Sequence, residues 1–476
     1  MVGLSSLAHA PTVGPTEDAE HVSFPSYDRD SLVPAVVHLG VGGFHRAHQA
    51  VYFDHLAASG CSEWGVVGVG ISRPELGEVL EAQDHLFLVV ERQGDRSRAR
   101  VVGSMVDYLL LADDPAAVTE RMADPQTRLV TMTITADGYR VDDEMQQGDS
   151  VFVPVVEALD NRRQAGVAPF TVLSCDNLPD SGAAARRAVL AVAARRSPEL
   201  VEWIDANVCF PSSMVDRITP STSDEVRDQV QDEFNIDDGW PVVTEEFSQW
   251  VIEDCFSNDR PQLDRVGARF VDDVAPYKLI KSRLLNGTHC ALGYLGYLAG
   301  YRRTDEAMAD PQIDRFITAL MRDEVAPLLP GDVAGMELDG YQRDLLERFG
   351  NTEIGDQLAR LCGRGSTKMV DYVLPSVHEA QDRPHRLLTL VVAAWCRYLQ
   401  GTDLQGEPIE VKDARRDELQ PLARTAGEDA RPFLEVEGIF GDLARGEQFC
   451  AEINRLVRLL DERGVQAAIA TCFEDA

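Results

Sequence analysis

The sequence is poor in lysine and lacks paired cysteines. Only four of its 476 residues are lysines, Lys278, Lys281, Lys368 and Lys412. Its nine cysteines stand singly, with no CxxC pair and no Cys/His spacing suited to zinc. A zinc finger and a CxxC redox motif are therefore excluded, and we expect reduced, buried thiols.

A run of apolar residues long enough to cross a bilayer is also missing. The longest, "LLTLVVAAWC" at residues 387–396, has about half the length that a membrane-spanning helix needs, so we interpret it as a core helix. No Lys or Arg precedes the weak apolar patch at the N-terminus. The sequence thus predicts neither a secretory signal nor a transit peptide, and we expect a cytoplasmic protein.

Positive charge is scarce overall. The formal net charge is -34 at pH 7, which makes nucleic acids and anionic membranes poor partners. The preference for Arg over Lys has two interpretations, a GC-rich genome or an acidic surface adapted to high salt, and composition alone does not decide between them.

The chain is long enough for two domains. Residues 1–30 are polar and contain Pro11, Pro15 and Pro25, which predicts an irregular arm. Over residues 31–280, β-branched runs alternate with helical stretches, which predicts an α/β domain with a parallel sheet. The runs are "AVVHLG", "EWGVVGVGI", "RLVTMTIT" and "FTVLSCDN". Helical periodicity dominates residues 281–476, which predicts a mainly α-helical second domain.

A glycine-rich turn follows the first of these strands, in "VVHLGVGGFHRAHQA". Gly40, Gly42 and Gly43 have the spacing that lets a backbone approach a pyrophosphate at the start of a helix. The third glycine of the usual fingerprint is replaced by His45. The first carboxylate after the next strand is Glu75, farther along than the usual ribose partner. The turn alone therefore leaves nucleotide binding and a purely structural turn as alternatives.

The histidines beside this turn allow several interpretations. His45 and His48 are three residues apart and face one side of the predicted helix, which is one long helix through "RAHQAVYFDHLAASG". No carboxylate or cysteine nearby completes a metal site, so packing or a position near phosphate is the preferred interpretation. Arg46 is a candidate to neutralise phosphate.

A second group of polar residues lies at the start of the helical domain, in "YKLIKSRLLNGTHCALGYLGYLAGY". Lys281, Asn286 and His289 would span an arc of about 140° on an α-helix. A lysine crowded by cations can act as a general base, and an asparagine can donate to an oxyanion. Oxidation of a secondary alcohol needs these groups and a nicotinamide. The alternative is a solvated amphipathic helix, but Gly287, Gly293, Gly296 and Gly300 indicate close packing or approach to a ligand.

Several motifs together resemble the mannitol dehydrogenase family of long-chain polyol dehydrogenases. They cover nearly the whole chain after the arm. The motifs are "GVGGFHRAHQA", "SCDNLPDSG", "FPSSMVDRITP", "WPVVTEEFSQWVIED", "KSRLLNGTHCALGYLGYLAGY", "RLCGRGSTK" and "VVAAWCRYLQG".

The resemblance implies a Rossmann-type N-terminal domain and a largely α-helical C-terminal domain, with the site in the cleft between them. It implies that the glycine turn, including Phe44, His45 and Arg46, binds the cofactor without any metal. By resemblance, Lys281 is the general base, Asn177 and Asn286 form the oxyanion hole, and His289 helps to place the substrate. Asp216, Arg360 and Lys368 would contact the remaining substrate hydroxyls. Many members are monomers, so we expect a monomer.

Two positions depart from the family pattern. Lys278 stands where members often have a glutamate three residues before the lysine, and "TITADGY" places Ala136 and Asp137 where "TITEGGY" is common. A second cation so close would lower the pKa of Lys281 further if both lysines face the cleft. Both glutamates are associated with moving the released proton to water, so the proton path is in question.

The sequence therefore predicts an NAD-dependent polyol dehydrogenase, with Glu75 near the adenosine ribose. NADP is the alternative, because Arg73 is suited to a 2'-phosphate. D-Mannitol oxidation to D-fructose is the first choice, followed by D-arabinitol 4-dehydrogenase and a reductase of fructuronate or tagaturonate. A non-catalytic nucleotide sensor is the most remote alternative.

Overall fold

The computed structural model describes residues 2–4, 22–141, 150–380, 383 and 385–474. The chain forms two compact units, Met1–Ala275 and Pro276–Ala476. The first corresponds to the predicted α/β domain and the second to the predicted helical domain. The expected boundary between residues 280 and 281 would cut off the last residue of helix α9 (Ala275–Lys281). The two units instead divide at the first residue of this helix, between Ala275 and Pro276.

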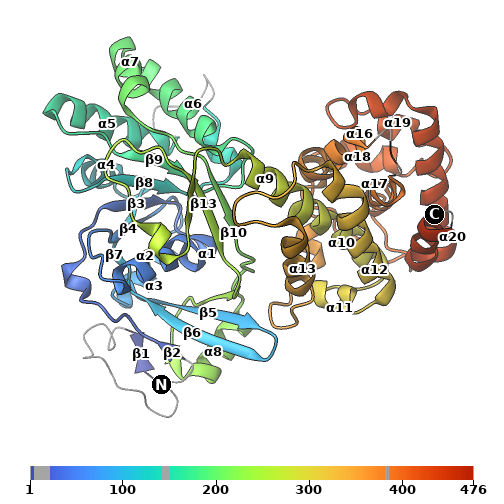
Figure 1. Ribbon diagram of the computed structural model, residues 1–476, viewed down its shortest axis with the longest axis horizontal. Coiled ribbons are helices and arrows are strands. Elements are labelled where there is room, and N and C mark those ends of the chain that lie inside the picture. Colours follow the sequence, from blue (N-terminus) through green and yellow to red (C-terminus); the bar gives the residue numbers. More distant parts are fainter. Residues whose placement is uncertain (1, 5–21, 142–149, 381–382, 384, 475–476) are drawn as a thin grey trace. The chain divides into compact units, whose positions relative to one another are not determined.

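The first unit is built on a five-stranded parallel sheet (Figure 1). Its strands are β3 (Val36–Leu39), β4 (Val66–Gly70), β7 (Met105–Leu110), β8 (Leu129–Met132) and β9 (Thr171–Ser174). Their spatial order is β7-β4-β3-β8-β9. The chain thus runs outward from β3 to β7 and then crosses back to β8, which is the order of a Rossmann-type sheet. The predicted fold class is confirmed, and the four predicted β-branched runs contain β3, β4, β8 and β9.

Helices and a small sheet cover the two faces of the parallel sheet. One face packs against α4 (Pro115–Ala123), α5 (Phe152–Ala165), α6 (Ser181–Ala194) and α7 (Pro198–Asn207) through a cluster of buried apolar side chains. The other face packs against α2 (Gln49–Ala58) and a three-stranded sheet of β10 (Ser213–Asp216), β13 (Gln249–Glu253) and β14 (Arg269–Val271). Successive side chains of a strand point to opposite faces of its sheet, so alternate residues of β3 contribute to the apolar clusters on the two faces.

A four-stranded mixed sheet completes the first unit, and the sequence patterns did not predict it. It contains β12 (Val242–Glu245), β5 (Phe87–Gln93), β6 (Arg96–Val102) and β2 (Val22–Ser23), in that order. β5 and β6 form a hairpin around Gly94, whose φ of +59° suits the turn. Helix α3 (Glu75–Ala82) follows β4, and α8 (Asp224–Phe234) follows β10.

Parts of the predicted arm take part in sheets. Val2–Gly3 (β1) pairs in parallel with Ile236–Asp237 (β11), and β2 pairs with β6. Irregular structure is therefore wrong for these four residues. Residues 5–21 lie outside the described residues.

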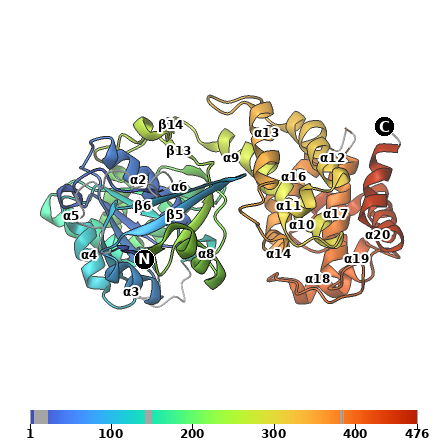
Figure 2. The same cartoon turned by 90° about the horizontal axis from the view of Figure 1, so that it is seen from below.

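The second unit is helical, as predicted, and α17 (Arg386–Leu399) lies in its middle, packed between α10 (Gly287–Leu298) and α20 (Glu447–Glu474) (Figure 2). The interpretation of "LLTLVVAAWC" as a core helix is confirmed, because its side chains are all buried. The other helices are α11 (Thr304–Met308), α12 (Pro311–Ala319), α13 (Leu338–Phe349), α14 (Leu358–Cys362), α15 (Gly365–Lys368), α16 (Leu374–Glu379), α18 (Arg416–Ala423) and α19 (Arg431–Leu434).

The helices of this unit contain π-helical segments at Ser282–Asn286, Leu320–Val325 and Met369–Val373. The first separates α9 from α10, and its end meets the third: a methyl group on Gly287 would lie 3.1 Å from the carbonyl oxygen of Tyr372. Gly293 and Gly296 approach Leu361, Ala307 and Leu358 equally closely. The predicted close packing is confirmed for Gly287, Gly293 and Gly296. It is wrong for Gly300, where a Cβ atom would meet no atom within 4 Å and the φ of +100° accounts for the glycine.

All nine cysteines are free thiols in this structure. Six are buried, but Cys61 and Cys209 are half-buried and Cys255 is exposed, so burial was wrongly expected for these three residues. Among the helices that the structure describes, none combines the length and apolar character needed to span a membrane.

Candidate active site

The glycine turn begins directly after β3, at the carboxyl edge of the parallel sheet. Gly40 has φ +94°, and a Cβ atom there would lie 2.3 Å from the carbonyl oxygen of Thr133, beyond the end of β8. Both the backbone conformation and the contact therefore require glycine. β3 and β8 flank the point where the strand order reverses, which is where open α/β sheets bind their ligands.

The histidine that replaces the third glycine packs behind this turn. His45 is buried and stacks on His38 of β3, with ring centroids 3.5 Å apart. His38 in turn hydrogen-bonds Thr131 at 2.8 Å and Thr133 at 3.0 Å. The Thr133 hydroxyl donates to the carbonyl oxygen of Gly40 at 2.9 Å. The imidazole at position 45 thus supports the turn from inside, and neither of its nitrogens has a hydrogen-bond partner among the described residues.

The helix after the turn is divided, so the single long helix expected there is wrong. α1 (Gly43–Ala47) ends at His48, whose φ of -119° and ψ of -87° are not helical, and α2 then begins at Gln49. A His48 ring nitrogen lies 3.0 Å from the carbonyl oxygen of Gln249 in β13, and this contact holds the break in place.

The remaining cofactor candidates differ in exposure. Gly42, Gly43 and Phe44 are half-buried at the start of α1. Arg46 is buried, donates to the carbonyl oxygen of Trp240 and lies over the ring of Phe87. Glu75 is exposed and begins α3, five positions after the last residue of β4.

The ends of β8 and β9 are joined by Asp176, which the motifs did not single out. Its carboxylate accepts hydrogen bonds from the backbone of Ile134 and Thr135 and from the Tyr139 hydroxyl, and burial raises its pKa. Thr135 has φ +63°, a strained value for a β-branched residue. Asn177, next in the chain, is exposed at the same edge of the sheet.

Asp216 is the last residue of β10 and is buried. Thr219, three residues on, contacts the glycine turn, since a Cβ atom on Gly43 would lie 4.0 Å from its methyl carbon. The first unit therefore places the predicted cofactor turn beside the segment that follows Asp216.

In the second unit, the predicted lysine, asparagine and histidine do not share one α-helix. Lys281 is the buried last residue of α9, Asn286 ends the π-helical segment, and His289 lies in the first turn of α10. The arc expected from α-helical geometry is therefore wrong, because a π-helical turn contains more residues. Bulges of this kind occur frequently at functional sites.

Asn286 and His289 carry polar atoms without partners. The Asn286 Nδ2 and His289 Nε2 atoms are buried and have no hydrogen-bond partner among the described residues. Burial lowers the pKa of His289 to about 3, so its ring is neutral at physiological pH. It packs on Phe349, with ring centroids 4.9 Å apart. Buried polar groups are normally satisfied, so these two atoms retain hydrogen-bonding capacity that the described residues do not use.

The two predicted substrate-binding cations lie near this histidine. Arg360 of α14 and Lys368 of α15 both affect the His289 ring electrostatically. Arg360 pairs with the buried carboxylate of Asp356, Nε to Oδ1 at 2.7 Å with a second bond from Nη2. The Lys368 ammonium donates to the carbonyl oxygens of Leu361 at 2.9 Å and Arg360 at 3.2 Å, and burial lowers its pKa.

The second unit thus brings together His289, Arg360 and Lys368. It adds Asp356 and Arg348, which the motifs did not single out and which also act on the histidine. Asp356 and Arg360 are four residues apart in the sequence, and this spacing could have predicted their ion pair.

The departures from the family pattern in the first unit differ in exposure, since Ala136 is half-buried and Asp137 is exposed. Ala136 begins a 3-10 turn, and the Asp137 carboxylate is exposed, 3.7 Å from Arg140. The described residues contain no group of three or more histidine, cysteine or carboxylate side chains placed to hold a metal ion.

The buried histidines predict a loss of stability in acid. Burial lowers the pKa of His38 to about 3 and that of His45 well below its usual value. The unfolded chain, with pKa values near 6.5, therefore binds protons that the folded chain does not. The free energy of unfolding should be highest above pH 6.5 and fall toward pH 3, by up to about 1.4 kcal/mol per pH unit for each histidine. Urea unfolding at pH 7.5 and 5.0 measures this, and His45→Gln should reduce the difference; an unchanged difference would contradict it.

Known family profiles match both units of the chain. The profile of the mannitol dehydrogenase Rossmann domain matches residues 34–265, and that of the mannitol dehydrogenase C-terminal domain matches residues 273–460. Mannitol 2-dehydrogenase of Pyricularia oryzae is 40% identical over 99% of both chains. That of Aspergillus oryzae is 41% identical, with 93% of this chain and 94% of that protein covered.

Two solved structures are similar over nearly the whole chain. Pseudomonas fluorescens mannitol 2-dehydrogenase, in a ternary complex with NAD and D-mannitol, aligns with a TM-score of 0.86 and 40% identity, covering 96% of this chain and 97% of that one. A substrate-free D-sorbitol dehydrogenase aligns with a TM-score of 0.88 and 33% identity, covering 98% and 100%. The chain therefore belongs to the mannitol dehydrogenase family of polyol oxidoreductases, as its motifs predict.

Proposed function

We propose that the protein catalyses the NAD-dependent oxidation of D-mannitol to D-fructose and the reverse reduction. The observation that carries the proposal is the pair of buried, unsatisfied atoms Asn286 Nδ2 and His289 Nε2, which follow a buried lysine in the chain. His289 also interacts electrostatically with Arg360 and Lys368. Donors of this kind suit an alcohol oxygen that becomes an alkoxide. The names of the relatives from Pyricularia oryzae and Pseudomonas fluorescens support the same substrate.

In this mechanism each residue has one task. Lys281 takes the proton of the reacting hydroxyl, while Asn286 and Asn177 donate to its oxygen. The neutral His289 orients the substrate, and Asp216, Arg360 and Lys368 hold its other hydroxyls. A bound NAD would supply the acceptor for the hydride. Lys278 lies one helical turn before Lys281 on α9, so its charge favours the neutral, proton-accepting form of the base if both face the substrate.

The glycine turn fits a dinucleotide. Gly40 brings the backbone close to Thr133, and adding a Cβ atom at Gly42 or Gly43 would meet no atom closer than 3.9 Å, so the start of α1 is open. A pyrophosphate at Gly42 and Gly43 could accept from the free backbone N–H groups there. Glu75 disfavours a 2'-phosphate, which supports NAD over NADP. The ternary complex of the Pseudomonas fluorescens relative contains NAD.

The ion pair of Arg360 favours a neutral polyol over a uronate. Asp356 occupies the Nε and Nη2 donors of the guanidinium and compensates its charge. A guanidinium engaged in this way cannot also bind a substrate carboxylate through the same bidentate edge. Its remaining donors suit hydroxyl groups, as a polyol offers.

A substrate panel tests the proposal. Initial rates should be highest with D-mannitol and NAD, lower with D-sorbitol and D-arabinitol, and at least about tenfold lower with NADP in place of NAD. In the reverse direction D-fructose should be reduced faster than fructuronate or tagaturonate. A preference for either uronate would replace the proposal with a hexuronate reductase, and NADH binding without turnover of any substrate would favour a nucleotide sensor.

The monomeric state and the cytoplasmic location stay predictions, which size-exclusion chromatography and cell fractionation measure.

A further inference from the structure

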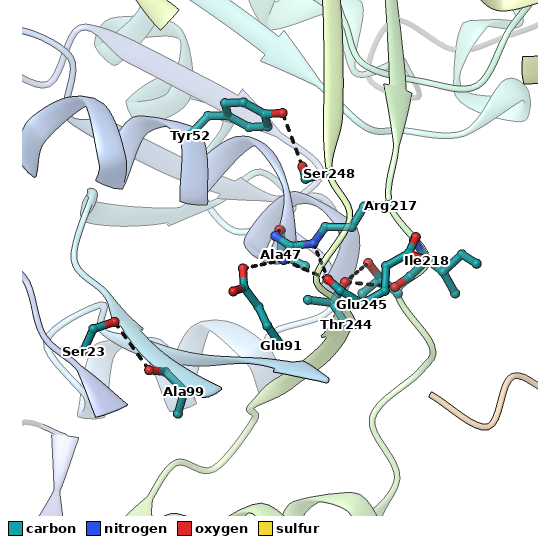
Figure 3. A network of polar contacts seen from close by, with 11 residues as sticks. Ser23, Ala47, Tyr52, Glu91, Ala99, Arg217, Ile218, Thr244, Glu245 and Ser248 are labelled. Atoms are coloured by element: carbon teal, nitrogen blue, oxygen red, sulfur yellow. Dashed lines mark hydrogen bonds and ion pairs between the residues drawn. The ribbon is translucent and has the colours of Figure 1, made fainter. Parts of the chain in front are cut away.

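Arg217 is a buried cation that connects three elements of the first unit (Figure 3). It follows Asp216 directly, and only 1% of its side chain is exposed. Its guanidinium donates to the carbonyl oxygen of Ala47 in α1 at 2.5 Å and to the carboxylate of Glu91 in β5 at 2.5 Å. It also donates twice to the carbonyl oxygen of Glu245 in β12, at 3.0 and 2.9 Å. The proposed mechanism gives this residue no task.

The contact with Ala47 fixes the helix of the cofactor turn. α1 has five residues and stops at the break at His48, so the carbonyl at its last residue cannot be satisfied by a continuing helix. A cation there also interacts favourably with the negative end of the helix. So short a helix has few bonds of its own, and Gly42 and Gly43 lie at its opposite end from Ala47.

The residues after Arg217 are fixed to the same strand. The carboxylate of Glu245 accepts a hydrogen bond from the backbone of Ile218, and the Thr244 hydroxyl donates to the Ile218 carbonyl oxygen at 2.9 Å (Figure 3). The hydroxyls of Thr219 and Thr244 lie 3.2 Å apart. The chain on the carboxyl side of Asp216 is thus held by bonds to β12, and Arg217 joins that support to α1.

We propose that Arg217 is a positioning residue that holds the cofactor-binding turn and the substrate-binding Asp216 in register with each other. The role of Arg217 toward Asp216 rests on the proposed function. Its role toward the cofactor rests on the interpretation of the glycine turn as a dinucleotide site. Glu91 is the partner that compensates the buried charge, and its side chain is 27% exposed. Arg217 touches neither ligand and acts through α1 and Asp216.

Arg217→Lys tests this role, because a lysine keeps the charge but cannot make all four hydrogen bonds. We expect the Kd of NADH, measured by fluorescence without substrate, and the KM of the polyol each to rise about tenfold, the size of one lost charged hydrogen bond. The value of kcat should stay within about threefold, since the reacting groups are unchanged. Glu91→Gln should also raise the Kd of NADH and the KM of the polyol, but by smaller factors. This variant still tests the inference if Arg217→Lys does not fold.

Arg162 provides the matched control. It is buried in α5 and donates to four backbone carbonyls at the amino edge of the parallel sheet, away from the glycine turn. These are the carbonyls of Ala168, Met122, Asp124 and Thr127. Arg162→Lys should lower the Tm to a similar degree without changing either constant.

The inference is overturned if Kd and KM are unchanged in Arg217→Lys, whether or not the Tm falls, or if both constants change equally in Arg162→Lys. If the wild-type enzyme turns over no polyol, the proposed function fails while the NADH measurement still tests the link to α1. If the wild type is active and Arg217→Lys matches it in all three constants, the inference alone fails.

Discussion

Replacing Lys281 with alanine should lower the turnover of the polyol by about 10²–10⁴-fold at pH 7, the contribution that general base catalysis usually makes. Lys281 is 7% exposed at the end of α9, directly before the π-helical segment that carries Asn286. Without a base, the hydroxyl proton must leave to water. Because the lysine belongs to the helical unit and the cofactor turn to the other, the Kd of NADH should stay the same. Steady-state rates and NADH fluorescence titration measure both quantities.

Lys412 gives a control for the loss of a cation from the same unit. Its ammonium is exposed and lies 3.4 Å from Glu410. Lys412→Ala should leave turnover and NADH affinity unchanged. Turnover that survives in Lys281→Ala would show that the base is another residue, and a parallel loss of NADH affinity would show a structural role.

Replacing Gly40 with alanine should have the second large effect, on both stability and cofactor affinity. The backbone conformation at φ +94° alone costs an alanine about 1–3 kcal/mol. In addition, its methyl group would lie 2.3 Å from the carbonyl oxygen of Thr133, which is backbone and cannot rotate away. The turn must then move by a large fraction of an ångström, and a displacement of that order can reduce kcat/KM by about a hundredfold.

Gly267 separates the two causes. It has φ +98°, close to that of Gly40, but no atom lies within 4 Å of the position of its Cβ. Gly267→Ala should therefore show the conformational cost alone, as a lower Tm with normal NADH binding. If Gly40→Ala loses no more stability than Gly267→Ala and binds NADH normally, the contact with Thr133 does not define the cofactor turn.

The parallel sheet was predictable because its strands are continuous β-branched runs. "AVVHLG" and "RLVTMTIT" become β3 and β8, buried on both faces as a central parallel strand must be. The hairpin of β5 and β6 was missed because β6, "RSRARVV", is largely polar and arginine-rich over its first half. Such a strand is stabilised by its antiparallel partner rather than by an apolar pattern of its own.

The site was predictable in its residue types but not in its geometry. Lys281, Asn286 and His289 are identifiable from the chemistry of their side chains. The π-helical segment between them ends where Gly287 packs closely against the carbonyl of Tyr372, 85 positions away, and no local pattern encodes such a contact. For the same reason, the sequence showed His45 only as a substitution for glycine, whereas the structure shows its stacking on His38.

The hydrogen bonds from Thr131 through His38 and Thr133 to Gly40 have a thermodynamic consequence. A glycine-rich loop ordinarily loses conformational entropy when it closes around a ligand, at about 1–2 kcal/mol for each residue that becomes ordered. In this protein the ordering accompanies folding, because the side chains behind the turn already fix its backbone. Cofactor association then requires little further ordering of the chain, so its calorimetric signature should be that of a rigid site, with a small entropic penalty.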